Sequence, residues 1–355
     1  MKATNIHRIN FRHSSFARAG FILLASLAMT IGSTTAGSAQ TIKIATIAPE
    51  GSAWMTDMRA GAKEIDERTE GRVKFKFYGG GVQGNDKQVL RKMRIGQLHG
   101  GAFTSNALAE LQKDSQLYAL PMLFNNLEEV NFARSHMDAK LQQLVEDAGY
   151  VNFGFAGGGF ASIMSNSPVA NLEDFRSLKV WVPDGDKLSY SAVKALGVSP
   201  VTMPLTDVLT GLQTELINTI MGPPAGAIVL QWNTAVSYIT ELPLAYIFAM
   251  LVIDKRVFEK MQGSDQAVVR EVMEGVYKGF DTQGVEDNEQ ALKALLAGGI
   301  KSVKADQGQV AVWRQKVQES NRELAQQGAI SVELLNEIQC YVDAFRAGDK
   351  DKDCG

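Results

Sequence analysis

From residue 41 onward, the chain alternates between short stretches with strand periodicity and longer stretches with helix periodicity. The segments 41–47 (TIKIATI) and 72–78 (RVKFKFY) place apolar residues at every second position, which is typical of a half-buried strand. Ser52 is a suitable cap for a helix between them. The apolar positions of that helix share one face: Trp54, Met58, Ala62 and Ile65. Strands separated by helices predict a parallel sheet with crossover connections.

The alternation continues to the end of the chain. Further strands are expected at 101–104, 151–155, 162–164, 178–183, 200–204, 218–221 and 244–253. Further helices are expected at 85–97, 186–196, 206–215, 264–297, 306–327 and 331–346. A turn is expected at residues 157–159, and Thr206 is the expected cap of its helix. Neither a repeat nor a composition break interrupts the pattern, so we expect two sheets joined by several chain crossings.

The first 39 residues have the three-part pattern of a secretory signal peptide. The opening part is basic and contains no acidic residue; its charges are Lys2, Arg8, Arg12 and Arg18. An apolar run (19–32) and a stretch of small residues (33–39) follow. The run is shorter than the roughly 20 residues that span a bilayer, which argues against a transmembrane anchor. We therefore expect cleavage near Ala39 and export to the periplasm of a chain that does not itself span a membrane.

Cleavage would change the formal net charge from −3 to −7, because the signal segment holds four basic residues. Nucleic-acid binding needs clustered lysine and arginine, so this charge argues against a nucleic-acid partner. About 315 residues would remain, which indicates two domains and is enough for a core that needs no covalent cross-links.

The two cysteines, Cys340 and Cys354, both lie near the C-terminus. An oxidising compartment favours a disulfide between them, which would clip the tail and have no catalytic role. Two unpaired surface thiols are the alternative.

The segment Gly79–Gly84 (GGGVQG) matches the G-x-G-x-x-G pattern of a dinucleotide-binding turn. That site also needs an acidic residue about 20 positions further on, after a second strand. Residues 101–109 contain none. We therefore interpret the segment as a strand-to-helix turn and expect no cofactor.

Motifs of catalytic and metal sites are also missing. His99 and His136 are the histidines that remain after cleavage, and neither has a cysteine or second histidine at metal-ligand spacing. The patterns H-E-x-x-H, C-x-x-C and G-x-S-x-G do not occur. We therefore expect no metal site and no enzyme activity. The alternative is an exported hydrolase whose two carboxylates converge in the fold.

Six segments carry a family resemblance through their order and spacing: Gly71–Lys74, Tyr78–Gly84, Leu120–Phe124, Asp174–Pro183, Ala195–Pro200 and Asp207–Gln213. With them the chain resembles the extracytoplasmic solute receptors of TRAP (tripartite ATP-independent periplasmic) transporters, the C4-dicarboxylate-binding or DctP type. The match covers essentially all of the chain after the signal segment. It implies a two-lobe periplasmic binding protein of the type II-like α/β fold, with parallel or mixed sheets and a ligand cleft between the lobes.

The resemblance also implies a mechanism and partners. A small-molecule solute would bridge the lobes and shift the population to a closed form. The small and large membrane subunits of the transporter would then recognise this closed form. We expect lobe I at 40–162 and 251–288, lobe II at 163–250, and C-terminal helices at 289–355 that pack on the lobes. The receptor of an ATP-driven ABC importer shares this design and is the alternative within the class.

The resemblance implies two arginines that hold a ligand carboxylate, and this chain differs at both positions. Trp181 stands in place of the first arginine, and Ala161 in place of the second. Hydrogen bonds to charged groups contribute roughly 1.5–3 kcal/mol each, so losing a two-bond clamp should weaken binding of an acid by about two orders of magnitude. We therefore predict a neutral, aromatic or amine-bearing ligand. An organic acid bound in another way is the alternative.

The expected ligand-binding residues lie at predicted strand ends and helix starts, where open α/β sheets bind their ligands. They are Glu50, Trp54, Asp86, Ser105, Asn106, Phe160, Ala161, Trp181, Gly222 and Pro223. Ordinary core packing is the alternative role for each of the aromatic residues.

Overall fold

The structure, a computed structural model, describes residues 39–355. The expected signal peptide, apart from Ala39, lies outside the described residues. Within residues 39–355, no helix has both the length and the apolar character that crossing a bilayer requires.

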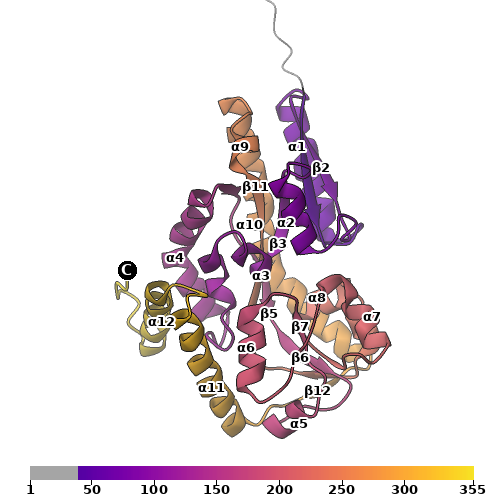
Figure 1. Cartoon of the computed structure of the whole chain (residues 1–355), viewed down its shortest axis with the longest axis vertical. Helices are drawn as coiled ribbons and strands as arrows, with labels where there is room; N and C mark the ends of the chain where they lie inside the picture. Colours follow the sequence, from indigo (N-terminus) through magenta and orange to yellow (C-terminus); the bar gives the residue numbers. More distant parts are fainter. Residues whose placement is uncertain (1–38) are drawn as a thin grey trace, which may run out of the picture. The chain divides into compact units, whose positions relative to one another are not determined.

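The larger sheet has six strands, and we call the part of the molecule built on it lobe I (Figure 1). Its strands are β1 (Gln40–Thr46), β2 (Val73–Tyr78), β3 (Gly100–Thr104), β4 (Tyr150–Asn152), β5 (Ala156–Phe160) and β11 (Tyr246–Asp254). Their order is β2-β1-β3-β11-β4, and β5 also pairs with β11. Strand β1 is parallel to β2 and β3, whereas β11 is antiparallel to β3, β4 and β5. The sheet is therefore mixed, and the expected parallel pairing holds among β1, β2 and β3.

The helices that follow β1 and β2 begin where the sequence predicts. Helix α1 (Ala53–Arg68) is capped by Ser52, whose hydroxyl accepts a hydrogen bond from the Met55 N–H. Helix α2 (Asp86–Arg94) is capped by Asn85, which forms a reciprocal capping box with Gln88. Burial follows the apolar pattern of the chain: Ile42, Ile44, Met55, Met58 and Ile65 are core residues of lobe I.

Two smaller sheets form the part that we call lobe II. One has the order β12-β10-β6-β9, and the other is the parallel pair β7-β8. The strands are β6 (Ser162–Ser165), β7 (Trp181–Pro183), β8 (Val201–Met203), β9 (Thr219–Gly222), β10 (Tyr238–Thr240) and β12 (Lys301–Val303). The short helices are α5 (Leu172–Arg176), α6 (Lys187–Ala195), α7 (Val208–Gln213) and α8 (Pro224–Val229). A single bridge between Val180 and Thr219 links the two sheets.

The chain crosses between the lobes several times. Strand β5 continues through Ala161 into β6, and β10 leads into β11. The long helix α10 (Gly263–Ala297) packs against α1 and β5 of lobe I and against α8 of lobe II. The two-lobe α/β architecture is as expected, and the residue boundaries given above for the lobes and C-terminal helices stay a prediction.

Most of the remaining helices lie on the outside of the two lobes, whereas α3 (Ser105–Ala109) lies near the centre of the molecule (Figure 1). The others are α4 (Leu127–Asp147), α9 (Lys255–Phe258), α11 (Gln307–Gln326) and α12 (Val332–Ala347), with 3₁₀ segments at Lys113–Ala119, Leu205–Asp207 and Trp232–Ala235. Helix α11 packs on α6, and α12 packs on α4. The structure joins Cys340 of α12 to Cys354 by a disulfide, with Cα atoms 5.9 Å apart.

Some local predictions are wrong. Residues 157–159 are not a turn but part of β5, where pairing with β11 overrides the turn preference of three glycines. Gly157 is needed there, because a Cβ atom would lie 2.7 Å from the Asp281 carboxylate. Thr206 does not cap α7; it lies within a 3₁₀ segment that precedes the helix. Strands β10 and β12 were not predicted, since three residues carry too little periodicity to be recognised.

The glycine-rich segment 79–84 is the turn between β2 and α2. The N–H groups of Gly80 and Gly81 donate to the carbonyls of Ala48 and Thr46, respectively. A Cβ atom at Gly79 would lie 2.9 Å from the Ala48 carbonyl oxygen. The close approach of two backbone segments thus explains Gly79, whereas Gly80, Gly81 and Gly84 adopt positive φ angles that favour glycine.

Candidate ligand-binding cleft

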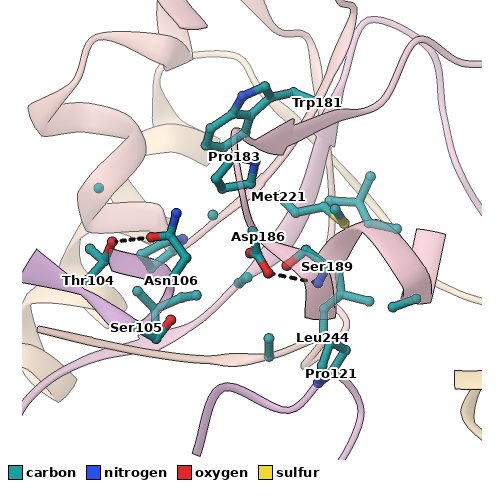
Figure 2. Close-up of a pocket in the computed structure, with 18 of the residues that line it drawn as sticks. Thr104, Ser105, Asn106, Pro121, Trp181, Pro183, Asp186, Ser189, Met221 and Leu244 are labelled. Atoms are coloured by element: carbon teal, nitrogen blue, oxygen red, sulfur yellow. Dashed lines mark hydrogen bonds between the residues drawn. The ribbon is translucent and has the colours of Figure 1, made fainter. Parts of the chain in front are cut away.

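A cavity of about 200 Å³ is lined by residues of both lobes (Figure 2). Lobe I contributes residues at or after the carboxyl ends of β1 and β3: Ile47, Trp54, Thr104, Ser105 and Asn106. Lobe II and the crossing strands contribute a larger set that includes Ala161, Trp181, Pro183, Asp186, Ser189, Met221, Gly222, Pro223 and Trp232. We call this space the main cavity.

Trp181 forms part of an apolar wall of the main cavity. It is the first residue of β7 and only 3% exposed. Its indole N–H donates a hydrogen bond to the carbonyl of Met203 in β8, at 3.1 Å, and its ring meets that of Trp232 edge-on, with centroids 5.5 Å apart. Because the N–H is used inside lobe II, Trp181 offers a ligand only carbon surface and π electrons.

Trp54 lies between two spaces. It is half-buried near the start of α1, and it lines both the main cavity and a second, apolar cavity of about 130 Å³. Ile47, Thr104 and Pro223 also line both spaces. Movement of the Trp54 side chain would therefore change the size and shape of the space open to a ligand.

The carboxyl end of β3 supplies neutral polar groups. The Thr104 hydroxyl donates to the Asn106 side-chain oxygen at 3.0 Å, which leaves the Asn106 amide nitrogen as a donor for other groups (Figure 2). Ser105 lies between them at the start of α3. This cluster is at a strand end, where α/β folds place their ligand contacts.

Asp186 is the one titratable side chain among the described residues that line the main cavity. It caps α6, where its carboxylate accepts a hydrogen bond from the Ser189 N–H at 2.9 Å (Figure 2). Burial raises the pKa of Asp186, and the hydrogen bonds from Ser189 and Leu188 act in the opposite direction. Lysine, arginine and histidine are absent from this lining.

A smaller cavity of about 50 Å³ adjoins the main cavity and shares Thr104, Asn106 and Pro183 with it. Asp86 of α2 lines it, and burial raises the pKa of Asp86 to about 6. Lys87 of lobe I and Asp184 of lobe II also line it, and they form an ion pair of 2.9 Å that joins the two lobes. Lys87, the basic side chain in the described lining of this smaller cavity, is therefore already paired with a carboxylate.

The structure brings most of the predicted ligand-binding residues together. Seven line the main cavity: Trp54, Ser105, Asn106, Ala161, Trp181, Gly222 and Pro223. Asp86 lines the adjoining cavity. Phe160 and Glu50 line none of these three cavities. Phe160 packs edge-on against Tyr246, and the exposed Glu50 pairs with Arg59 at 2.6 Å.

Sequence reasoning missed other residues of the main cavity, among them Ile47, Phe175, Asp186, Met221, Trp232 and Trp313. Trp232 and Trp313 lie far from any matched motif, and only tertiary packing brings them here. Asp186 had a signal, since it opens a helix directly after β7 and thus occupies the position where ligands contact such folds. Among residues 39–355, no group of three or more acidic, histidine or cysteine side chains is placed to hold a metal ion.

Comparison with known proteins identifies the family. Residues 44–327 match the model of the family described as bacterial extracellular solute-binding protein, family 7 (DctP). The chain is 22% identical over 240 residues to the C4-dicarboxylate-binding periplasmic protein DctP of Rhodobacter capsulatus, covering 67% of this chain and 72% of that protein.

Solved structures share the fold. A TRAP periplasmic solute-binding protein from Xanthobacter autotrophicus with bound beta-D-galacturonate has a TM-score of 0.77 and 19% identity, over 85% of this chain and 99% of the other. One from Sulfurospirillum deleyianum with bound succinate has a TM-score of 0.77 and 18% identity, over the same shares. The chain therefore belongs to family 7 of the bacterial extracellular solute-binding proteins, the DctP family of TRAP transporter receptors.

Proposed function

We propose that this receptor works in the periplasm, captures a small organic solute between its lobes and delivers it to the small and large membrane subunits of a TRAP transporter. We propose further that the solute lacks the carboxylate anchor of the acid-binding receptors and is neutral, aromatic or amine-bearing. The main cavity carries this proposal, because its described lining holds four tryptophans and no basic side chain: Trp54, Trp181, Trp232 and Trp313.

The physical argument concerns the cost of burying a carboxylate. Galacturonate, succinate and C4-dicarboxylates, which the names of the similar proteins mention, all carry carboxylate groups. An ionised carboxylate loses its water on entering a closed cleft and needs a cation or several N–H donors in return. In this chain it would meet Trp181 and Ala161 at the expected arginine positions, and Asp186 in the same cavity. Two like charges in a low-dielectric space repel each other.

The lobes supply a way to hold the solute. They meet at the cleft rim through the Lys87–Asp184 pair, and Gly81 of lobe I approaches the Thr206 side chain of lobe II. A solute that touches both lobes stabilises the form in which they meet, and its binding energy shifts the population towards that form. Transport by such a receptor requires no bond to be made or broken, so we propose no enzyme activity.

A thermal-shift screen over a metabolite library tests the function. A ligand at a hundredfold excess over its Kd stabilises the folded state by about 2.7 kcal/mol, which raises the melting temperature clearly. We expect hits among neutral, aromatic or amine compounds, and X-ray scattering should show compaction when a hit is added. Tight binding of a simple dicarboxylate that is undiminished in Trp181→Ala would contradict the proposed ligand class. Absence of compaction with every hit would contradict capture by closure.

A further inference from the structure

The charges around the cleft do not balance. The described lining of the main cavity contributes one carboxylate, that of Asp186, and no basic group. The adjoining cavity adds Asp86, Asp184 and Lys87, of which the last two neutralise each other. The cleft therefore holds two carboxylates, one from each lobe, without a cationic partner.

Helix capping explains only part of the role of the Asp186 side chain. One carboxylate oxygen accepts the Ser189 N–H at 2.9 Å, as an N-cap residue does. The partial positive charge of the α6 N-terminus also offsets some of its negative charge. A carboxylate has acceptor capacity for several donors, however, and an uncharged serine or asparagine would cap the helix equally well. The cap alone thus gives no reason for an ionisable group in an apolar cavity.

We propose that the cleft selects an organic cation, in which a primary or quaternary amine pairs with Asp186 while an apolar body lies against Trp54 and Trp181. This inference rests on the proposed receptor function and narrows its ligand class. The tryptophans suit such a guest, because a cation is attracted to the negative face of an indole ring and an apolar skeleton loses its water against it. Asp86, on the opposite lobe, adds to the negative potential that the cation meets.

The same charges link ligand recognition to closure. When the lobes meet, Asp86 and Asp186 lose water, and burial of an unpaired carboxylate is unfavourable. A cation in the cleft offsets the lost water: a primary ammonium group donates a charge-assisted hydrogen bond, and a quaternary ammonium group, which has no N–H, acts through its charge alone. A neutral molecule of the same shape gives no such compensation, so we expect the amine to drive closure better than its neutral analogue.

Calorimetry with compounds matched in shape tests the inference. The probes are phenethylamine, 2-phenylethanol and 3-phenylpropanoate, within a panel of small primary and quaternary amines, alcohols and carboxylates. We expect the tightest ligand of the panel to be an amine and its affinity to fall about tenfold or more in Asp186→Asn. Asparagine keeps the helix cap, and Asp186→Ser is a second capping variant in case the first folds poorly.

Asp306→Asn is the matched control. Asp306 is exposed and caps α11 through the Gln309 N–H, so the variant makes the same chemical change outside the cavity, and amine affinity should stay within about twofold. The inference is overturned if the tightest ligand is neutral or anionic, if no amine binds, or if amine affinity is unchanged in both Asp186 variants. In each case the receptor function stands as long as some class of compound stabilises the protein. That function fails only if no compound in the full screen does so.

Discussion

At the scale of single residues, the described lining of the main cavity contains no basic side chain that could pair with a carboxylate. Trp181 uses its N–H within lobe II and leaves an apolar surface where the family resemblance implies a guanidinium group. Asp186 adds a negative charge to the same space. Each change alone would weaken the binding of a carboxylate, and together they favour a guest of the opposite or of no charge.

The half-buried carboxyl group of Asp86 predicts a pH dependence of stability. Burial raises its pKa to about 6, so the folded state holds this proton more tightly than the unfolded state does. The unfavourable contribution is small below pH 4, develops as the pH rises from about 4 to about 6, and is complete above pH 6. We therefore compare the free energy of unfolding of Asp86→Asn with that of wild type at two pH values. This difference should shift in favour of the variant by on the order of 1–3 kcal/mol when the pH rises from 4 to 7.5.

Urea unfolding of both proteins at the two pH values measures this difference. The same substitution at Asp57, which is exposed on α1, controls for the loss of a surface charge. A gain from Asp86→Asn that does not vary with pH would show that desolvation of this carboxyl group does not affect stability.

At the scale of elements, a charge network around the nearly buried Arg134 connects α4, α10 and the crossing strands. Arg134 of α4 pairs with Asp281 of α10 at 2.6 Å and with Asp138 at 3.0 Å. It also contacts the hydroxyl of Tyr246 in β11, and the N–H of Gly157 in β5 donates to Asp281. The network thus fixes the helices to the strands that lead from one lobe to the other.

Removal of the cation from this network should be costly. We expect Arg134→Met to lower the free energy of unfolding by about 2–3 kcal/mol, because it leaves Asp281 without its cation. The side chain of Asp281 keeps some contact with water, so this loss is smaller than the loss expected when a fully buried ion pair is broken. The double variant Arg134→Met/Asp281→Asn should be less destabilised than the sum of the single variants. Denaturant titration measures all three, and strict additivity would argue against coupling between the two residues.

At the scale of the whole molecule, the relation between the lobes decides function. Helix α10 joins them through Asn288, whose side chain donates to the Gly158 carbonyl and accepts from the Ala225 N–H. On the other side of the cleft, the Lys87–Asp184 pair is exposed and lies at the rim. An exposed ion pair contributes little to the free energy of unfolding. If the pair forms only when the lobes meet, however, its full interaction energy stabilises the closed form relative to the open form.

We therefore expect Lys87→Gln to weaken solute binding about two- to fivefold while leaving the free energy of unfolding nearly unchanged. The effect should shrink at high salt, because exposed charges are screened. Lys63→Gln removes another exposed lysine, one of α1 that pairs with Glu67 and lines none of the three cavities, and should leave affinity unchanged. Calorimetric titration with a hit from the screen measures both variants, and equal affinities would exclude a role of the rim pair in closure.

Residues close together in the chain determined what the sequence alone could predict. Periodicity and capping residues located β1, α1, β2 and α2, and the three long C-terminal helices begin and end within a residue or two of their predicted bounds. These features depend on local hydrogen bonds and on which face of a helix or strand is apolar, and consecutive residues determine both. The ordered motifs led to the family, and the identities of residues 161 and 181 led to the prediction that this chain lacks the arginines implied by the resemblance.

Tertiary structure alone decided the composition of the cleft. It made residues 157–159 a strand, because β11 arrives from almost 90 residues later to pair with them. It placed Trp232 against Trp181, left Phe160 outside the three cavities and put Asp186 in a lining without basic groups. Charge balance in a cavity is a sum over residues from distant segments, and packing determines which of them are included. Local patterns therefore predicted the receptor, and only the fold shows the charge that its solute meets.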